Sequence, residues 1–150
     1  MKIISHRGNL KGINKSEENT ILAIHRALDY GFDVEIDIWF ENQCFYLGHD
    51  NPTTKIDISK FNNKKIWFHA KNIKSLVEFK NENIINYFWH EEDQATIVSS
   101  GYFWLYPGVF INNKNCIFVL PEQHNCDLLS YSVYGICTDE PIKYQNLFKI

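Results

Sequence analysis

The segment Asp33-Val-Glu-Ile-Asp-Ile-Trp-Phe40 alternates apolar and polar side chains with a period of two, which is typical of a β-strand. Because successive side chains of a strand point to opposite faces, Glu35 and Asp37 share one face. Two carboxylates at this spacing can approach a single hard cation such as Mg²⁺ or Ca²⁺. A strand with one face in solvent would show the same pattern, so the segment alone leaves both interpretations open.

Short apolar runs and amphipathic stretches alternate on either side of this segment. An apolar run at 2–5 ends at His6-Arg7-Gly8. Residues 19–30 carry apolar side chains at helical spacing, with Asn19 as the candidate N-cap. Strands that alternate with helices indicate repeated βα units in a parallel sheet. Further strands are expected at 44–47, 65–68, 84–89, 102–106, 116–120 and 133–137, and helices at 73–80 and 141–148, with less regular helical patterns at 92–97 and 123–130.

The length limits the kind of barrel that these units can build. A (β/α)8 barrel usually takes about 250 residues, with about 200 near the low end. This chain has 150 residues. We therefore expect a single domain over residues 1–150 with an α/β fold: a trimmed or incomplete TIM-type (β/α) barrel with mainly parallel strands and shortened helices.

Composition and charge argue against several classes of protein. The chain is 45% hydrophobic and 15% aromatic, which favours a packed core over disorder. Its 15 Lys and Arg residues are outnumbered by 18 Asp and Glu residues, which argues against a nucleic-acid partner. No window approaches about 20 apolar residues and no secretory leader is evident, so we expect no membrane span and a cytoplasmic location. The four cysteines lack paired spacing, which indicates reduced thiols rather than a zinc cage.

Residues with catalytic chemistry follow the ends of several predicted strands. In a parallel barrel the carboxyl ends of the strands meet at one mouth, so these residues can converge there. Two histidines can act as base and acid on opposite sides of a phosphoryl or acyl centre, and arginine suits bidentate phosphate binding. A single histidine is more often a packed or surface residue, so only the whole set points to a site. The set comprises His6, Arg7, Glu35, Asp37, His49, Asp50, His69, Lys71 and His90.

Four short motifs follow one another in the first third of the chain: His6-Arg7-Gly8, Glu18-Asn19-Thr20, the segment from Gly31 to Asp37, and Gly48-His49-Asp50. In order and spacing they resemble the N-terminal signature of the glycerophosphodiester phosphodiesterases, and the resemblance covers residues 3–52. That family has a TIM-type barrel, requires a divalent cation, and belongs with the phosphodiesterases that are similar to phosphatidylinositol-specific phospholipase C. The resemblance implies a hydrolase of lipid metabolism.

The resemblance also implies roles for individual residues. His6 and His49 would be the general acid–base pair, and Arg7 would hold the phosphate. Glu35 and Asp37 would bind the metal. These roles agree with the chemistry that the residue types suggest by themselves.

Other matches to the family are partial. Glu18 and Asn19 match a motif that shapes and lines the family's site and helps to bind the substrate. The family's third strand ends in Glu-x-Lys, in which the Glu helps to bind metal and the Lys contacts phosphate. Here Lys71 is retained, while His69 stands in the Glu position. Near residue 139, the segment Gly135-Ile-Cys-Thr-Asp-Glu-Pro141 resembles the family's final strand and turn.

The replacement at His69 bears on the cofactor. An imidazole can replace a carboxylate as a ligand, but it removes one negative charge and shifts preference from Ca²⁺ toward Mn²⁺ or Zn²⁺. We expect one divalent cation, which is Mg²⁺ or Ca²⁺, or Mn²⁺ or Zn²⁺ if His69 is a ligand.

The sequence thus predicts a metal-dependent phosphodiester hydrolase that acts on a small molecule, such as a glycerophosphodiester or a phosphate-linked saccharide. Two alternatives stay open. One is a non-catalytic protein that binds a phosphorylated sugar or headgroup, because the chain is short and lacks the third carboxylate. The other is a phosphodiester lyase that gives a cyclic phosphate. An oligomer would cover the apolar edges that a trimmed barrel exposes.

Overall fold

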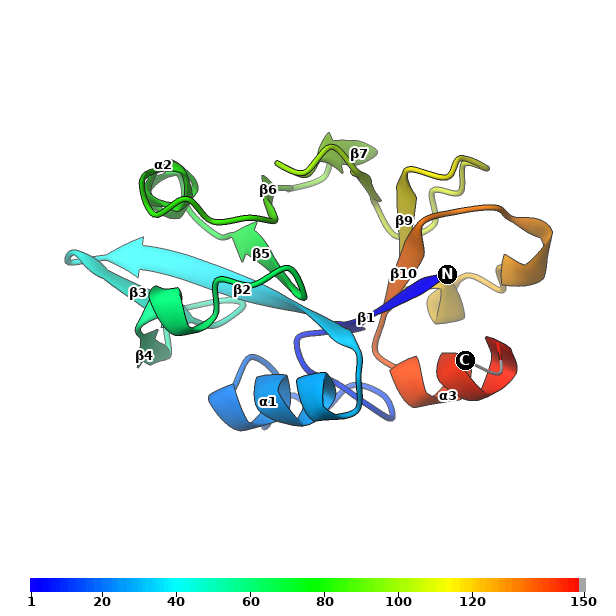
Figure 1. Ribbon diagram of the computed structural model, residues 1–150, viewed down its shortest axis with the longest axis horizontal. Coiled ribbons are helices and arrows are strands. Elements are labelled where there is room, and N and C mark those ends of the chain that lie inside the picture. Colours follow the sequence, from blue (N-terminus) through cyan, green and yellow to red (C-terminus); the bar gives the residue numbers. More distant parts are fainter. Residues whose placement is uncertain (149–150) are drawn as a thin grey trace.

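The computed structural model describes residues 1–148 and shows an α/β fold in which one mixed sheet curls into a half-barrel (Figure 1). Only short helices accompany the sheet: α1 (Ile21–Asp29), α2 (Ile73–Asn81) and α3 (Pro141–Phe148), with 3₁₀ turns at Ile58–Lys60, Pro121–Gln123 and Leu128–Ser130. The strands of the described residues are β1 (Lys2–His6), β2 (Asp33–Glu41), β3 (Cys44–Leu47), β4 (Thr54–Ile56), β5 (Ile66–Ala70), β6 (Tyr87–Trp89), β7 (Ala95–Ile97), β8 (Phe103–Leu105), β9 (Cys116–Val119) and β10 (Gly135–Thr138). No helix of residues 1–148 has the length and apolar character needed to cross a membrane.

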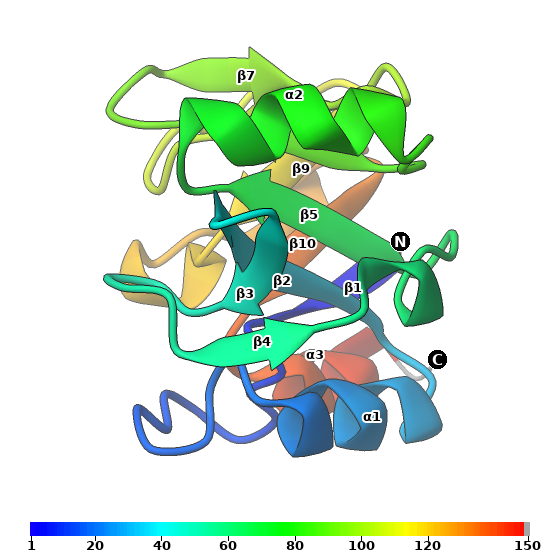
Figure 2. The same cartoon turned by 90° about the vertical axis from the view of Figure 1, so that its left-hand side faces the viewer.

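Strand β1 lies at the centre of the sheet, between β2 and β10, and is parallel to both. On one side β2 continues to β5 and β6, and on the other β10 continues to β9 and β8, all in parallel (Figures 1 and 2). The carboxyl ends of these strands therefore face the same side of the molecule. The register places His6 opposite Glu35 and Asp37 opposite His69.

The expectation of mainly parallel strands is wrong, because the sheet is mixed. Strand β3 pairs antiparallel with both β2 and β4, and β7 pairs antiparallel with β8. The turn between β2 and β3 consists of Asn42 and Gln43, both with positive φ (48° and 59°). A two-residue turn of this kind can join only antiparallel neighbours.

The sheet curls, but within residues 1–148 its hydrogen-bonded strand pairs do not close into a complete ring. Within the described residues no ladder joins β6 to β7 or β8. Ser99 connects the two ends of the sheet there: its N–H donates to Tyr87 O at 2.8 Å, and its hydroxyl accepts from Tyr87 N at 2.9 Å and donates to Ile85 O at 2.8 Å. The predicted trimmed barrel is thus supported only as a half-barrel.

The predicted helices at 19–30, 73–80 and 141–148 correspond to α1, α2 and α3. The N-cap of α1 is Thr20 instead of Asn19, because the Asn19 side chain is engaged elsewhere. The helix predicted at 92–97 is wrong, since Thr96 and Ile97 lie in β7 and pair with β8. The pattern at 123–130 gives only 3₁₀ turns.

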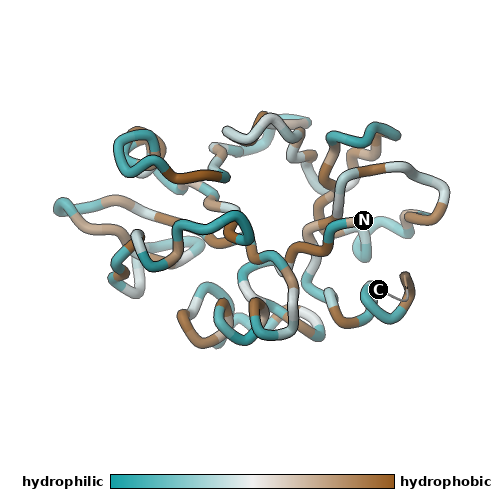
Figure 3. The backbone as a smooth tube through the Cα atoms, in the orientation of Figure 1, coloured by the Kyte–Doolittle hydropathy of each residue, from teal (hydrophilic) through white to brown (hydrophobic). Residues whose placement is uncertain are grey.

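Apolar side chains fill both faces of the sheet. In Figure 3 the brown, apolar stretches follow the central strands, whereas many of the outer loops are teal. The helices pack on the outer face. One cluster lies inside the curl, since its members come from strands of both halves of the sheet and from Val98: Ile4, Trp67, Phe88, Val98, Trp104, Ile117, Val119 and Cys137. Because this interior is apolar, the polar side chains of the strands gather at the carboxyl ends.

Helix α2 supports β5 through one buried aromatic ring. Phe79 is fully buried and its ring packs against Phe45, Phe68 and Tyr87. Replacing Phe79 by Ala should lower the free energy of unfolding by about 3–5 kcal/mol, because it leaves a cavity beneath the helix. Urea denaturation followed by circular dichroism measures this loss. Val77→Ala on the same helix is the control, because Val77 is 53% exposed and its truncation should cost less than about 0.5 kcal/mol.

Candidate functional site

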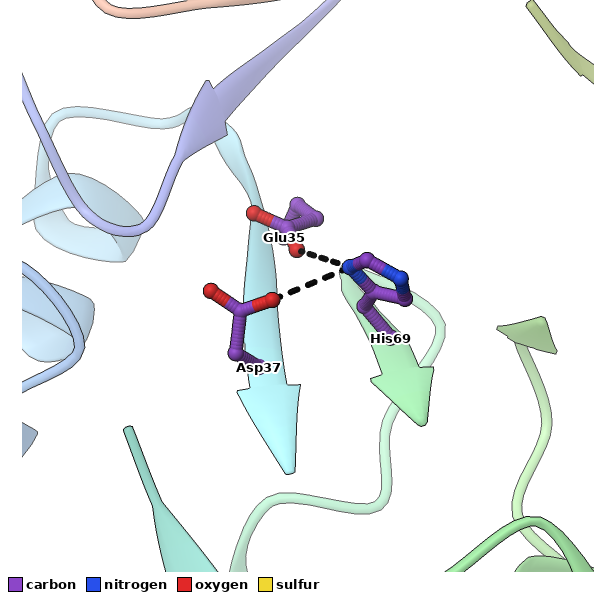
Figure 4. A group of neighbouring side chains, drawn as sticks. All are labelled: Glu35, Asp37 and His69. Atoms are coloured by element: carbon purple, nitrogen blue, oxygen red, sulfur yellow. Dashed lines mark ion pairs between the residues drawn. The ribbon is translucent and has the colours of Figure 1, made fainter. Parts of the chain in front are cut away.

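Three potential metal ligands meet where β2 and β5 lie side by side. One nitrogen or oxygen atom from each of Glu35, Asp37 and His69 lies within 4.8 Å of the other two (Figure 4). The Nδ1 atom of His69 is 3.0 Å from Asp37 Oδ1 and 3.7 Å from Glu35 Oε1. Both carboxylates are buried. A solvent-facing strand is thereby excluded as the reason for their spacing.

Asp37 is the electrostatic centre of this group. Arg7 Nε lies 3.0 Å from Oδ2, and Lys71 Nζ lies 3.7 Å from Oδ1. Burial by itself would raise the pKa of Asp37, but the contact with His69 and the charges of Arg7 and Lys71 hold it well below its usual range. His69 Nδ1 approaches Oδ1 without the alignment of a hydrogen bond, so this buried oxygen lacks a hydrogen-bond partner within residues 1–148.

The loop after β1 is fixed to Asp37 through Asn19. The Asn19 amide donates to Asp37 Oδ2 at 2.8 Å and accepts from the Asp37 backbone N–H at 3.0 Å. Asn19 N in turn donates to Arg7 O at 2.9 Å, and both residues have positive φ (55° and 54°). Gly8, with φ +80°, has no room for a side chain, because a Cβ there would lie 2.8 Å from the Ala23 backbone. The motifs that contain Arg7 and Asn19 thus form one structural unit.

Glu18 gives Arg7 a second acidic partner. Arg7 Nη1 lies 3.3 Å from Glu18 Oε1, while the Arg7 backbone N–H reaches Glu35 Oε2 at 3.2 Å. Burial would lower the pKa of Arg7, but Asp37, Glu35 and Glu18 raise it above its ordinary value. The side chains of Arg7 and Lys71 are each 18% exposed, so both can still meet a solvent-borne anion.

His6 is held by an aspartate that the sequence reasoning missed. Its Nδ1 lies 2.8 Å from Asp139 Oδ1, and its Nε2 lies 3.9 Å from Glu35 Oε2. Burial opposes protonation of His6, but the hydrogen bond to Asp139 and the charge of Glu35 outweigh it and raise the pKa. Asn9 also donates to Asp139, at 2.9 Å. Asp139 directly follows β10, and the parallel pairing of β10 with β1 brings it to His6.

His69 is set in place by its neighbours on β6. Its ring stacks on Phe88 with centroids 4.9 Å apart and planes inclined by 13°. Its Nε2 lies 3.1 Å from the backbone oxygen of His90. Burial would lower the pKa of His69, but Asp37 and Glu35 prevail and raise it to about 9.

His49 lies apart from this network. Its Nδ1 is 2.7 Å from Asp50 Oδ1, and its side chain is 37% exposed. Among the described residues it has no ion pair or hydrogen bond with His6, Glu35 or Asp37. It does line a cavity of about 210 Å³ together with Glu18 and Asn19. The backbone N–H of the preceding residue, Gly48, donates to Asp37 O at 3.2 Å. His49 is thus near the network, but its side chain faces it only across this cavity in the part of the chain that the structure describes.

His90 lies next to the site, and its backbone oxygen contacts His69. Its two ring nitrogens are buried and have no hydrogen-bond partner in residues 1–148, and its ring meets Tyr106 edge-on at 5.5 Å. Burial and the nearby His69 lower its pKa. The structure thus gives the imidazole of His90 no polar contact with the ligand group.

Of the eleven residues that the sequence singles out, the side chains of His49, Asp50 and His90 stay outside the network described above. The other eight are joined by contacts around the carboxyl ends of β1, β2 and β5: His6, Arg7, Glu18, Asn19, Glu35, Asp37, His69 and Lys71. Comparison of the chain with family models, curated proteins and solved structures finds no match. Any functional interpretation therefore depends on this geometry and its chemistry.

Proposed function

We propose that this chain is a metal-dependent phosphodiester hydrolase that resembles the glycerophosphodiester phosphodiesterases and uses a trimmed TIM-type barrel as its scaffold. The observation that carries the proposal is the meeting of Glu35, Asp37 and His69 with the cationic side chains Arg7 and Lys71 at one end of the sheet. Acidic ligands for a cation and basic groups for an anion in the same place suit a metal-bound phosphate.

The residues present fit a divalent cation. Two carboxylates and one imidazole supply oxygen and nitrogen donors within 4.8 Å, and buried Asp37 Oδ1 lacks a hydrogen-bond partner among the described residues. Glu35, Asp37 and His69 would hold the ion. When bound, the cation supplies positive charge to a non-bridging phosphate oxygen as negative charge builds up there.

Arg7 and Lys71 would hold the phosphate itself. Each is oriented by Asp37, and Arg7 also by Glu18, so neither must be ordered when an anion arrives. Such preorganised charge is worth more than the same charge on a mobile side chain, because no reorganisation is needed during the reaction.

His6 and His49 would exchange protons with the substrate. Asp139 engages His6 at Nδ1, which leaves Nε2, on the side of Glu35, as the atom that takes or gives a proton. His49 would act from the cavity that it shares with Glu18 and Asn19. One histidine would deprotonate the nucleophile and the other would protonate the leaving alkoxide. If the nucleophile is a hydroxyl of the substrate, the product is a cyclic phosphate.

A non-catalytic phosphate-binding protein is the second candidate. It is favoured by the position of His49, which makes no contact with the ligand group in the described residues. Such a protein would retain the anion site of Arg7 and Lys71 without the second proton-transfer group.

The test of the proposed function is hydrolysis of bis(p-nitrophenyl) phosphate and of glycerophosphodiesters by chelated protein, with Mg²⁺, Ca²⁺, Mn²⁺ and Zn²⁺ restored singly. Turnover should return with at least one metal and fall at least about 100-fold in Glu35→Ala, because one of the two carboxylate ligands is lost. Glu91→Ala, at an exposed position after β6, is the control and should keep full activity.

Three results would contradict a metal-dependent hydrolase. Turnover that survives chelation, or that survives in Glu35→Ala, would show that the ligand group has no part in the reaction. Binding of a phosphodiester without turnover in any metal would favour the binding protein. Phosphorus NMR of the products distinguishes a phosphomonoester from a cyclic phosphate, and hence hydrolase from lyase.

A further inference from the structure

Two contacts hold the imidazole ring of His69 in place, one to its face and one to its Nε2 atom. Phe88 stacks against the ring at 4.9 Å, and the His90 carbonyl oxygen lies 3.1 Å from Nε2. Because a carbonyl oxygen can only accept, Nε2 must carry a hydrogen. This is how proteins orient a metal-binding histidine: the nitrogen that does not bind the metal donates to a carbonyl or carboxylate, and this fixes the tautomer.

The remaining nitrogen, Nδ1, points between the two carboxylates. It lies 3.0 Å from Asp37 Oδ1 and 3.7 Å from Glu35 Oε1, and both lines converge on this one atom in Figure 4. A metal ion held here would meet Nδ1 on one side and the two carboxylates on the other. The donor set facing the ion is then one nitrogen and two carboxylate groups.

The composition of this donor set disfavours hard cations, which depend on carboxylate charge, more than it disfavours ions that also bind nitrogen. Ca²⁺ takes 6–8 oxygen ligands, and Mg²⁺ binds through carboxylates while keeping several waters. Here the two carboxylates are already faced by two resident positive charges, since Arg7 lies 3.0 Å and Lys71 3.7 Å from Asp37. A nitrogen donor adds affinity for Mn²⁺ and, more strongly, for Zn²⁺, but little for Mg²⁺ or Ca²⁺.

We propose that the site selects a transition-metal ion of the Mn²⁺ to Zn²⁺ class over Mg²⁺ and Ca²⁺, with His69 Nδ1 as a direct ligand beside Glu35 and Asp37. This inference rests on the cation site of the proposed function, but not on the reaction. It identifies His69 as the residue that determines which metal the site accepts.

The test is binding of the metal ions alone to chelated protein, without any substrate. Titration calorimetry should show Zn²⁺ binding at least about 100-fold more tightly than Mg²⁺, with Mn²⁺ between them. In protein with ¹⁵N-labelled histidine, long-range NMR should show Zn²⁺ shifting Nδ1 of His69 while Nε2 keeps its hydrogen. His25→Gln on the exposed face of α1 is the matched control and should bind Zn²⁺ as the wild type does.

A variant at His69 weakens the preference for Zn²⁺ if the inference is right. His69→Glu should lower the ratio of Zn²⁺ to Mg²⁺ affinity by about 10-fold or more, because it exchanges nitrogen for oxygen and adds a negative charge. Circular dichroism establishes that the variant folds, and the NMR measurement on the wild type needs no variant. Mg²⁺ or Ca²⁺ binding as tight as Zn²⁺, or Zn²⁺ shifting other histidines but not His69, would overturn the inference.

These outcomes are separate from those of the proposed function. Zn²⁺ bound through His69 in a protein that hydrolyses no phosphodiester would support this inference and contradict the hydrolase. Hydrolysis with Mg²⁺, in a protein that binds Mg²⁺ as tightly as Zn²⁺, would do the reverse.

Discussion

Replacing His6 by Ala should remove nearly all phosphodiester turnover and leave the protein folded. The loss should reach about 10²–10⁴-fold, the usual contribution of a positioned acid or base. The reason is geometric: Asp139 holds Nδ1 at 2.8 Å, and Nε2 lies 3.9 Å from Glu35 Oε2, on the side of the ligand group. The measurement is kcat for bis(p-nitrophenyl) phosphate at saturating metal, with circular dichroism to establish folding.

His49→Ala tests the second member of the pair in the same assay. We expect a loss of similar size, even though the side chain of His49 is 37% exposed and faces the network across the cavity that it lines with Glu18 and Asn19. His25→Ala is the matched control, since this histidine lies on the outer helix α1. If both His6→Ala and His49→Ala keep their activity, the acid–base assignment is wrong.

Replacing Asp37 by Asn should have the largest combined effect on stability and metal binding. Asp37 is fully buried and faces three groups that can carry positive charge: Arg7 at 3.0 Å, His69 at 3.0 Å and Lys71 at 3.7 Å. Removing one partner of a buried ion pair costs about 3–5 kcal/mol, because the remaining charges stay buried without compensation. The variant should also bind no divalent cation at concentrations that saturate the wild type.

Urea denaturation in the presence of a chelator measures the stability of the metal-free protein, and calorimetry measures the binding. Asp29→Asn, at the exposed end of α1, is the control and should change the free energy of unfolding by less than about 0.5 kcal/mol. A variant with wild-type stability would show that Arg7, His69 and Lys71 do not depend on Asp37. A variant that binds metal normally would exclude Asp37 as a ligand.

The central strands and the three helices were predictable, because their apolar residues recur with a clear period. The strands at the margins were not. β4 (Thr54–Ile56) has no apolar run, and its Lys55 is exposed, so nothing in the sequence distinguishes it from a loop. β7 (Ala95–Ile97) follows a run of acidic residues that reads as the first turn of a helix, and only its pairing with β8 makes it extended.

The same limit applies to the site. Glu35 and Asp37 could be found because strand periodicity places them on one face, and His6 and His69 because they end strands on either side of them. Asp139 could not be found by spacing, since it lies 133 positions from His6 and meets it only when β10 pairs with β1. The mixed sheet was not predicted, because the apolar pattern indicates a strand at 44–47 but not the direction in which that strand pairs with β2.

The pairing of β1 with β10 also has a consequence for biosynthesis. Contacts between distant parts of a chain form late, because the entropy of closing a long loop must be overcome first. The ribosome releases β1, β2 and β5 well before β10, so a nascent chain can bring Glu35, Asp37 and His69 together early. His6 gains its aspartate partner only when translation has passed residue 139. In an unfinished polypeptide the three potential metal ligands can thus meet before His6 has its aspartate partner.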